Sequence, residues 1–247
     1  TINYPLLLKV TGLDKEDTAF IELPSTFPVE NRRILLLNRY SLNRDSMQDK
    51  GVMKRVAEEV ESIMNKHTNE RGLILTTSYY LAEQIYEYCT SKRNRLLLAK
   101  GLTMEEIMEK HLSTSNSVII TPSMWEGVDL KDDLCRFIII VKTPYPDLSD
   151  KRTAVLATKD REWYELHTIS RLIQGSGRGV RHDKDYCITY VLDSNVSWLL
   201  KKRGYKDKDK DKDKDIPAWF REAIVWNGSN RHIATTVTTS RLEDLFR

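Results

Sequence analysis

Six short runs of almost uninterrupted apolar residues recur along this chain of 247 residues. They are rich in leucine, isoleucine and valine, and they occupy residues 33–38, 72–77, 95–100, 117–121, 136–141 and 186–192. Strands that are buried on both faces of a sheet have this composition, whereas a half-exposed strand alternates apolar with polar side chains. We therefore expect a sheet that is covered on both faces.

Segments with helical patterns separate these runs. The expected helices span residues 46–66, 79–90, 103–111 and 150–173. Regular alternation of strand and helix is typical of an α/β fold in which a mostly parallel sheet carries helices on both faces. Ligands of such sheets bind at the loops that follow the carboxyl ends of the strands, so we expect the functional residues there.

The composition narrows the class of protein. The formal net charge is only +3, from 39 Lys and Arg against 36 Asp and Glu, so any surface for nucleic acid must be local. Three widely spaced cysteines argue against a disulfide framework and against a zinc ribbon, which favours an intracellular protein. No apolar run is long enough to span a membrane. The chain begins with Thr1 rather than methionine, and we expect it to be part of a longer protein.

Two C-terminal segments break the α/β pattern. Residues 206–215 are five Lys-Asp repeats without an apolar side chain, which predicts a solvated linker; a partner-binding tract is the alternative. Residues 216–226 have the pattern of a short amphipathic helix that packs back onto the domain. The predicted organisation is one α/β domain over 1–203, a charged linker over 204–215, and a C-terminal helical appendage with a tail over 216–247.

Three of the ten glycines, Gly175, Gly177 and Gly179, surround Arg178 and precede Arg181. This cluster is not a dinucleotide fingerprint, because a valine stands at the third glycine position and the segment follows a helical pattern instead of a strand. The chain also has no glycine followed by lysine and no Asp-Glu pair, so it lacks a phosphate-binding P-loop and its magnesium carboxylate. It is not expected to hold a triphosphate by itself.

The cluster contains the pattern Q-x-x-G-R-x-x-R, formed by Gln174, Gly177, Arg178 and Arg181. Planar, permanently charged guanidinium groups suit the charge that develops on a transferring phosphoryl group. Glycines around them would leave room for phosphate groups to approach the backbone. The alternative is a surface turn in which the arginines pair with Asp183 or Asp185.

The pattern resembles motif VI of superfamily 2 helicases. Residues 123–146, "SMWEGVDLKDDLCRFIIIVKTPYP", are similar to motif V in the XPD/DinG branch of that superfamily. Residues 25–33 resemble the start of the second motor domain in this branch, and residues 75–85 resemble its motif IV. Together with residues 163–193, the motifs follow the branch in order from about residue 13 to residue 200.

The resemblance implies a RecA-like second motor domain of an ATP-dependent DNA helicase with 5′-to-3′ polarity. ATP and Mg²⁺ would lie between this domain and an N-terminal motor domain, which is absent from the sequence. The residues implied at the phosphates are Arg178, Arg181 and Gln174. Those implied elsewhere at the ATP site are Glu126, Gly127, Asp129 and Gly177.

The resemblance also implies binding of single-stranded DNA by Ser78, Tyr79 and Trp125, with an aromatic ring available to stack on a base. The alternative for Trp125 is a core position beside Gly127. An iron–sulfur cluster, if the parent protein has one, would belong to the absent domain, because the cysteine spacing here does not suit cluster ligation. Two other functions stay open: a nucleic-acid-binding module without motor activity, and a stand-alone α/β enzyme such as a small phosphotransferase.

Overall fold

The computed structural model describes residues 4–19, 21, 23–205 and 216–226. Its described part forms a seven-stranded sheet in the order β3-β4-β2-β5-β6-β1-β7, and every neighbouring pair is parallel. The strands are β1 (Ile34–Tyr40), β2 (Gly72–Leu75), β3 (Leu96–Leu98), β4 (Val118–Thr121), β5 (Phe137–Ile140), β6 (Ile188–Asp193) and β7 (Ile224–Trp226). The six predicted strands are thus confirmed, with ends that differ by at most two residues.

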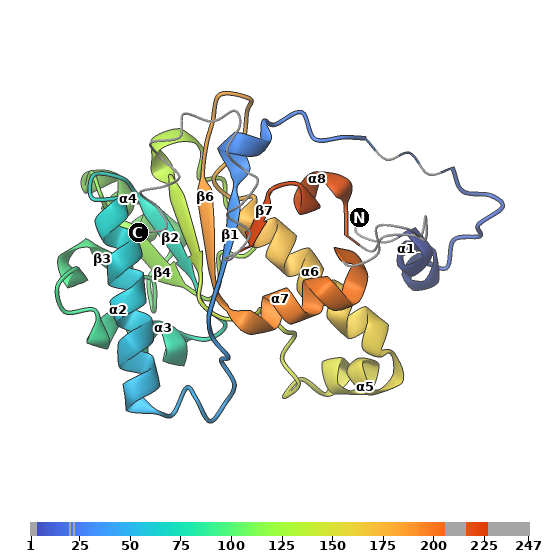
Figure 1. Ribbon diagram of the computed structural model, residues 1–247, viewed down its shortest axis with the longest axis horizontal. Helices are drawn as coiled ribbons and strands as arrows, with labels where there is room; N and C mark the ends of the chain where they lie inside the picture. The colour runs from blue at the N-terminus through green and yellow to red at the C-terminus, as the bar shows by residue number, and fades with distance from the viewer. Residues whose placement is uncertain (1–3, 20, 22, 206–215, 227–247) are drawn as a thin grey trace.

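Helices cover both faces of the sheet, as the apolar runs predicted (Figure 1). On one face lie α2 (Lys50–Lys66) and α3 (Tyr79–Tyr88), and on the other lie α4 (Met104–Ser113), α6 (Arg161–Ser176) and α7 (Ser194–Leu200). Successive residues of β2 serve different faces: Leu73 and Leu75 pack with the α6 layer, and Ile74 packs with the α2 layer. A RecA-like α/β fold is the result.

The segment 150–173, expected as one helix, contains two. Helix α5 (Lys151–Lys159) ends at Asp160, and the same residue caps the start of α6. Its carboxylate accepts a hydrogen bond from the backbone N–H of Trp163 (3.0 Å), while its own backbone has left the helical region. A short acidic side chain that binds the backbone in this way favours a helix start over a helix interior, which explains the break.

The C-terminal segment also differs from expectation. The predicted helix over 216–226 is limited to α8 (Ala218–Arg221), and residues 224–226 form β7 beside β1. This segment therefore extends the sheet, because Ile224 and Val225 are buried against it. The Lys-Asp repeats and residues 227–247 lie outside the described residues, and the domain boundaries stay a prediction. None of the helices in the described part is both long and apolar enough to cross a membrane.

Candidate functional site

Two loops that are about 50 residues apart in the sequence meet beside the sheet. The first, 122–136, runs back from the carboxyl end of β4 to the start of β5, and the second, 177–187, joins α6 to β6. The Arg178 side chain donates from Nε to the Trp125 carbonyl (3.0 Å) and from Nη1 to the Val128 carbonyl (2.9 Å). The Nη2 of Arg181 donates to the same Val128 carbonyl (3.1 Å). The predicted motif V and motif VI residues therefore share one site.

Arg178 and Arg181 lie on a loop that precedes a strand, β6. We had expected ligand-binding residues on loops that follow the carboxyl ends of strands. The two arginines still reach the β4 loop because that loop folds back along the sheet. Gly127 makes this path possible, since its φ of 78° is a left-handed conformation that favours glycine. A Cβ at that position would meet nothing within 4 Å, so its backbone conformation, and not lack of space, is the reason for glycine.

Arg181 forms an ion pair with Asp129, in which Nε lies 2.5 Å from Oδ1. The expected alternative, a side-chain pair with Asp183 or Asp185, is wrong. The Asp185 carboxylate contacts Arg181 through its backbone N–H (3.1 Å) and not through its guanidinium group. The Arg181 and Asp129 side chains are 34% and 65% exposed. An exposed pair of this kind contributes about 0–1 kcal/mol, so it leaves Arg181 able to exchange partners.

Each guanidinium group keeps one nitrogen without a hydrogen-bond partner among the described residues, Nη2 of Arg178 and Nη1 of Arg181. Burial and the neighbouring charge of Arg181 lower the pKa of Arg178, and the charges of Glu126 and Asp129 act in the opposite direction. Arginine stays protonated at neutral pH in spite of such shifts. The site thus presents two adjacent cations with open donors, an arrangement suited to a phosphate group.

The three glycines have different roles. A Cβ on Gly175 would lie 2.7 Å from the ring of Trp125, and a Cβ on Gly179 would lie 2.4 Å from the sulfur of Cys187. Only Gly177 is open, because the nearest atom would be a backbone oxygen 3.5 Å away. The expectation that all three clear space for phosphate is therefore wrong for Gly175 and Gly179, which are required by core packing.

The residues expected at nucleic acid are only partly accessible. The oxygen of the Ser78 hydroxyl caps α3 by accepting the N–H of Leu81 (3.2 Å), and Tyr79 is half-buried. Trp125 is 2% exposed, and its Nε1 donates to the carbonyl of Thr76 (2.9 Å). The alternative of a core position for Trp125 is thus correct, and its ring cannot stack on a base in this structure.

Comparison with known proteins identifies the family to which this chain belongs. The helicase C-terminal domain family matches residues 60–207. This chain belongs to that family. The helicase domain is 26% identical to the ATP-dependent DNA helicase YoaA of Haemophilus influenzae over 195 residues, which are 75% of this chain and 30% of the relative. It is also 26% identical to YoaA of Escherichia coli over 206 residues, 79% of this chain and 32% of the relative.

A shorter match is 32% identical to the ATP-dependent DNA helicase CHL1 of Candida albicans over 97 residues, 32% of this chain and 12% of the relative. Among solved structures, the helicase domain aligns with Xpd4 of S. tokodaii at a TM-score of 0.47 and 14% identity, covering 79% of this chain and 38% of that one. The chain spans about a third of the length of the two YoaA relatives. The expected membership in the XPD/DinG type of helicase is confirmed.

The sequence placed Asp185 only as an alternative partner of the arginines and did not predict that it holds the two loops together. The carboxylate of Asp185 is fully buried and accepts hydrogen bonds from Nη1 of Arg136 (2.8 Å) and from the backbone N–H groups of Asp132, Arg181 and Tyr186. Its location four residues after Arg181 is visible in the sequence, but its partners lie up to 53 residues away. Asp185 therefore sets the backbone position from which Arg181 projects.

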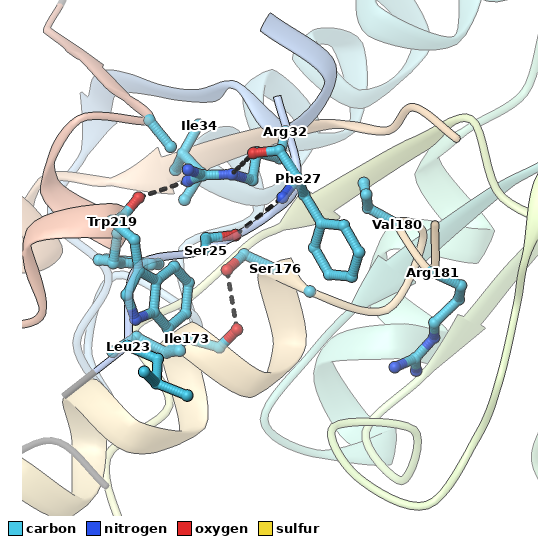
Figure 2. A pocket seen from close by; sticks show the side chains of 13 residues that line it. Leu23, Ser25, Phe27, Arg32, Ile34, Ile173, Ser176, Val180, Arg181 and Trp219 are labelled. Atoms are coloured by element: carbon cyan, nitrogen blue, oxygen red, sulfur yellow. Dashed lines mark hydrogen bonds between the residues drawn. The ribbon is translucent and has the colours of Figure 1, made fainter. Parts of the chain in front are cut away.

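A cavity of about 280 Å³ opens beside Arg181 (Figure 2). Its walls are mainly apolar and include Phe27, Ile173 and Trp219. Arg32, on the same wall, donates to the carbonyl of Phe27 (3.0 Å) and to that of Trp219, so its charge is used within the domain. The cavity thus provides an apolar surface next to Arg181.

Proposed function

We propose that this chain is the C-terminal motor domain of an ATP-dependent DNA helicase with 5′-to-3′ polarity. A first motor domain outside this chain would supply the triphosphate loop and the acidic pair that are absent from this sequence. Support comes from family membership and from relatives that are named ATP-dependent DNA helicases. The assignment of DNA as substrate rests on the same relatives and on the XPD/DinG resemblance.

The observation that carries the proposal is the convergence of Arg178 and Arg181 on the carbonyl of Val128. This carbonyl fixes both side chains, and it leaves an Nη group of each arginine to donate to phosphate oxygens. Fixed donors aimed at developing charge stabilise a phosphoryl-transfer transition state without reorganisation at the moment of reaction. Arg178 and Arg181 would therefore act from this domain on phosphates held by the other.

The neighbouring residues have roles consistent with this site. Asp129 pairs with Arg181 in the structure, and the weakness of an exposed pair lets a nucleotide replace it. Gln174 is exposed at the last turn of α6 and would orient a phosphate oxygen as an uncharged group. We assign Glu126, Gly127 and Gly177 to the wall of the ATP site, where Gly127 sets the turn of the loop.

The residues of this chain do not fit Mg²⁺ well. Within the described ranges, one group of potential metal ligands comes together, formed by Asp132, His182 and Asp185. Both oxygens of Asp185 already accept hydrogen bonds, and His182 Nε2 lies 2.8 Å from the Asp132 carboxylate. Mg²⁺ prefers oxygen ligands in octahedral geometry. We therefore assign the Mg²⁺ that accompanies ATP to the other motor domain.

The central test is Arg181→Ala in the full-length protein that carries this chain. We expect ATP hydrolysis to fall by roughly 10²- to 10⁴-fold, somewhat less than the largest effects of arginine fingers, because Arg178 stays in place. Arg181→Lys should restore little, since lysine lacks the planar fork that bridges two oxygens. Steady-state ATPase assays in the presence of single-stranded DNA provide the measurement.

Nearly unchanged turnover in Arg181→Ala would contradict the motor assignment. A protein that binds DNA but hydrolyses no ATP even at full length would instead favour the binding-module alternative. The 247-residue chain alone should show no DNA-stimulated hydrolysis, because half of the proposed site lies on the other domain.

A further inference from the structure

A second hollow, of about 340 Å³, lies where β4 ends and is lined mainly by polar residues. Its lining comes from the loop after β4 and from α6, and consists of Pro122, Ser123, Trp125, Glu126, His167 and Arg171. His167 and Arg171 are four residues apart on α6, so their side chains lie on the same face of the helix. The hollow therefore joins the motif V loop to the helix that precedes motif VI.

Arg171 is the distinctive group of this hollow. Its guanidinium carbon lies 5.5 Å from the centroid of the Trp125 ring, and it has no hydrogen bond or ion pair with the part of the chain that the structure describes. Arg178 and Arg181, by contrast, each bond to protein carbonyls. A guanidinium group that is oriented by stacking but has open donors can bind an oxyanion without first breaking a protein contact.

The other lining residues set the local charge. Burial and the charge of Arg171 lower the pKa of His167, and the charge of Glu126 raises it. The His167 ring stacks on Trp163 at 5.3 Å, and the Ser123 hydroxyl lies 2.8 Å from that of Thr121. Glu126, the carboxylate in the lining, repels an incoming anion. Removal of its charge should therefore strengthen the binding of an anion in this hollow.

The geometry points to this hollow as a binding site for a backbone phosphate of single-stranded DNA, with Arg171 as its main donor. This inference rests on the proposed function and identifies a contact that replaces the expected stacking on Trp125. The ligand group is a phosphate, which either DNA or a nucleotide could supply. DNA is favoured because the hollow is built on the loop after the carboxyl end of β4, and Trp125 links it to the loop after β2.

The positions of the arginines around Trp125 support the same choice. Arg178 binds the backbone carbonyl of Trp125, whereas Arg171 lies against its ring. The nucleotide donors and the proposed DNA donor are thus separate groups that contact one buried residue. A strand held at Arg171 would lie next to the loop that anchors Arg178, without occupying the same donors.

The test compares Arg171→Gln with Arg152→Gln in the 247-residue chain, by fluorescence anisotropy with a labelled oligothymidine. Arg152 is an exposed residue of α5 whose side chain forms no hydrogen bond or ion pair with the described residues, so it matches the change in charge. Glutamine keeps part of the side chain over Trp125. We expect Arg171→Gln to weaken binding about tenfold and Arg152→Gln to leave it nearly unchanged.

The salt dependence gives a second readout, because loss of one phosphate contact on a single strand lowers the slope of log K against log salt by about 0.7. Glu126→Gln should tighten binding about threefold, since it removes a negative charge from the hollow. A role for Glu126 at ATP alone would leave oligothymidine binding unchanged.

NMR titration of His167 distinguishes the sources of phosphate. Oligothymidine should raise the pKa of the imidazole, because a bound anion stabilises its protonated form. ATP or inorganic phosphate should do so much less at equal concentration. A larger response to ATP, or equal effects of Arg171→Gln and Arg152→Gln, would overturn the inference while leaving the motor assignment intact. Failure of the unaltered chain to bind oligothymidine would contradict both.

Discussion

The charged groups at the two ends of helix α6 differ in how fully they are paired within the protein. Near its start, the Glu165 carboxylate is 2% exposed and binds Arg161 (3.1 Å), Lys202 (2.5 Å) and Arg203 (2.7 Å). Just past its end, Arg178 and Arg181 bind carbonyl oxygens and keep open donors.

The difference separates structural charges from functional ones. In the Glu165 cluster, one buried carboxylate forms ion pairs with cations from α6 and from the segment after α7. These ion pairs fix how the two elements pack. The arginines beyond α6 carry positive charge that the protein leaves incompletely neutralised. Substitutions of the charged residues at the first end should therefore change the free energy of unfolding, and substitutions of Arg178 or Arg181 should change turnover.

The largest expected effect on stability is that of Glu165→Ala. It removes a buried carboxylate that binds both Lys202 and Arg203, and we expect a loss of about 3 kcal/mol in the free energy of unfolding. Urea unfolding followed by circular dichroism measures it. Arg161→Ala is the control, because this side chain is 75% exposed and its loss should cost less than about 0.5 kcal/mol. Equal losses in the two variants would show that the cluster is not a closed unit.

The glycines sharpen the comparison at the other end of α6. Gly179→Ala forces a Cβ to within 2.4 Å of the Cys187 sulfur and 2.8 Å of the Cys135 carbonyl, and should cost about 2 kcal/mol. Gly177→Ala meets no atom closer than 3.5 Å and should melt like the unaltered chain. Thermal melts of the two variants provide the measurement, and a stable Gly179→Ala would mean that this loop can move away from the sheet.

The pH dependence of stability should come in part from Glu165. Burial alone raises its pKa, but hydrogen bonds from Lys202 and Arg203 outweigh burial and hold the pKa below the usual carboxyl value. A lowered folded-state pKa means that the stabilisation is complete above the unfolded value of about 4.3 and is lost as the pH falls through the folded value. Melting temperatures measured between about pH 6 and pH 3 should therefore fall more steeply for the unaltered chain than for Glu165→Gln. Parallel curves would contradict this assignment.

The smallest expected change is in the stability of Arg181→Ala. Its ion pair with Asp129 is exposed, so its removal should alter the free energy of unfolding by about 0–1 kcal/mol. The same substitution is expected to suppress ATP hydrolysis strongly. A large loss of stability in chemical denaturation would show that Arg181 belongs with the structural charges, and would remove the contrast between the two ends of α6.

The sequence by itself determined the layers of the fold and the family. Apolar runs with no polar alternation predict strands covered on both faces, because a side chain on each face must be buried. The order of the motifs, from residues 25–33 to residues 163–193, predicted the helicase type before any contact was known. Each apolar run and each motif is local, whereas the order of the motifs can be read along residues 25–193 without any knowledge of contacts.

Only the tertiary structure decided which motif residues are accessible. Trp125 is buried because Gly175 lets α6 approach its ring, and Arg178 and Arg181 are fixed by a carbonyl about 50 residues away. Likewise, residues 224–226 form a strand because the edge of β1 is open to them. Burial and hydrogen bonding between distant segments depend on how the whole chain packs. The spacing of residues within a motif therefore predicts the type of site, and the fold selects the atoms that can act in it.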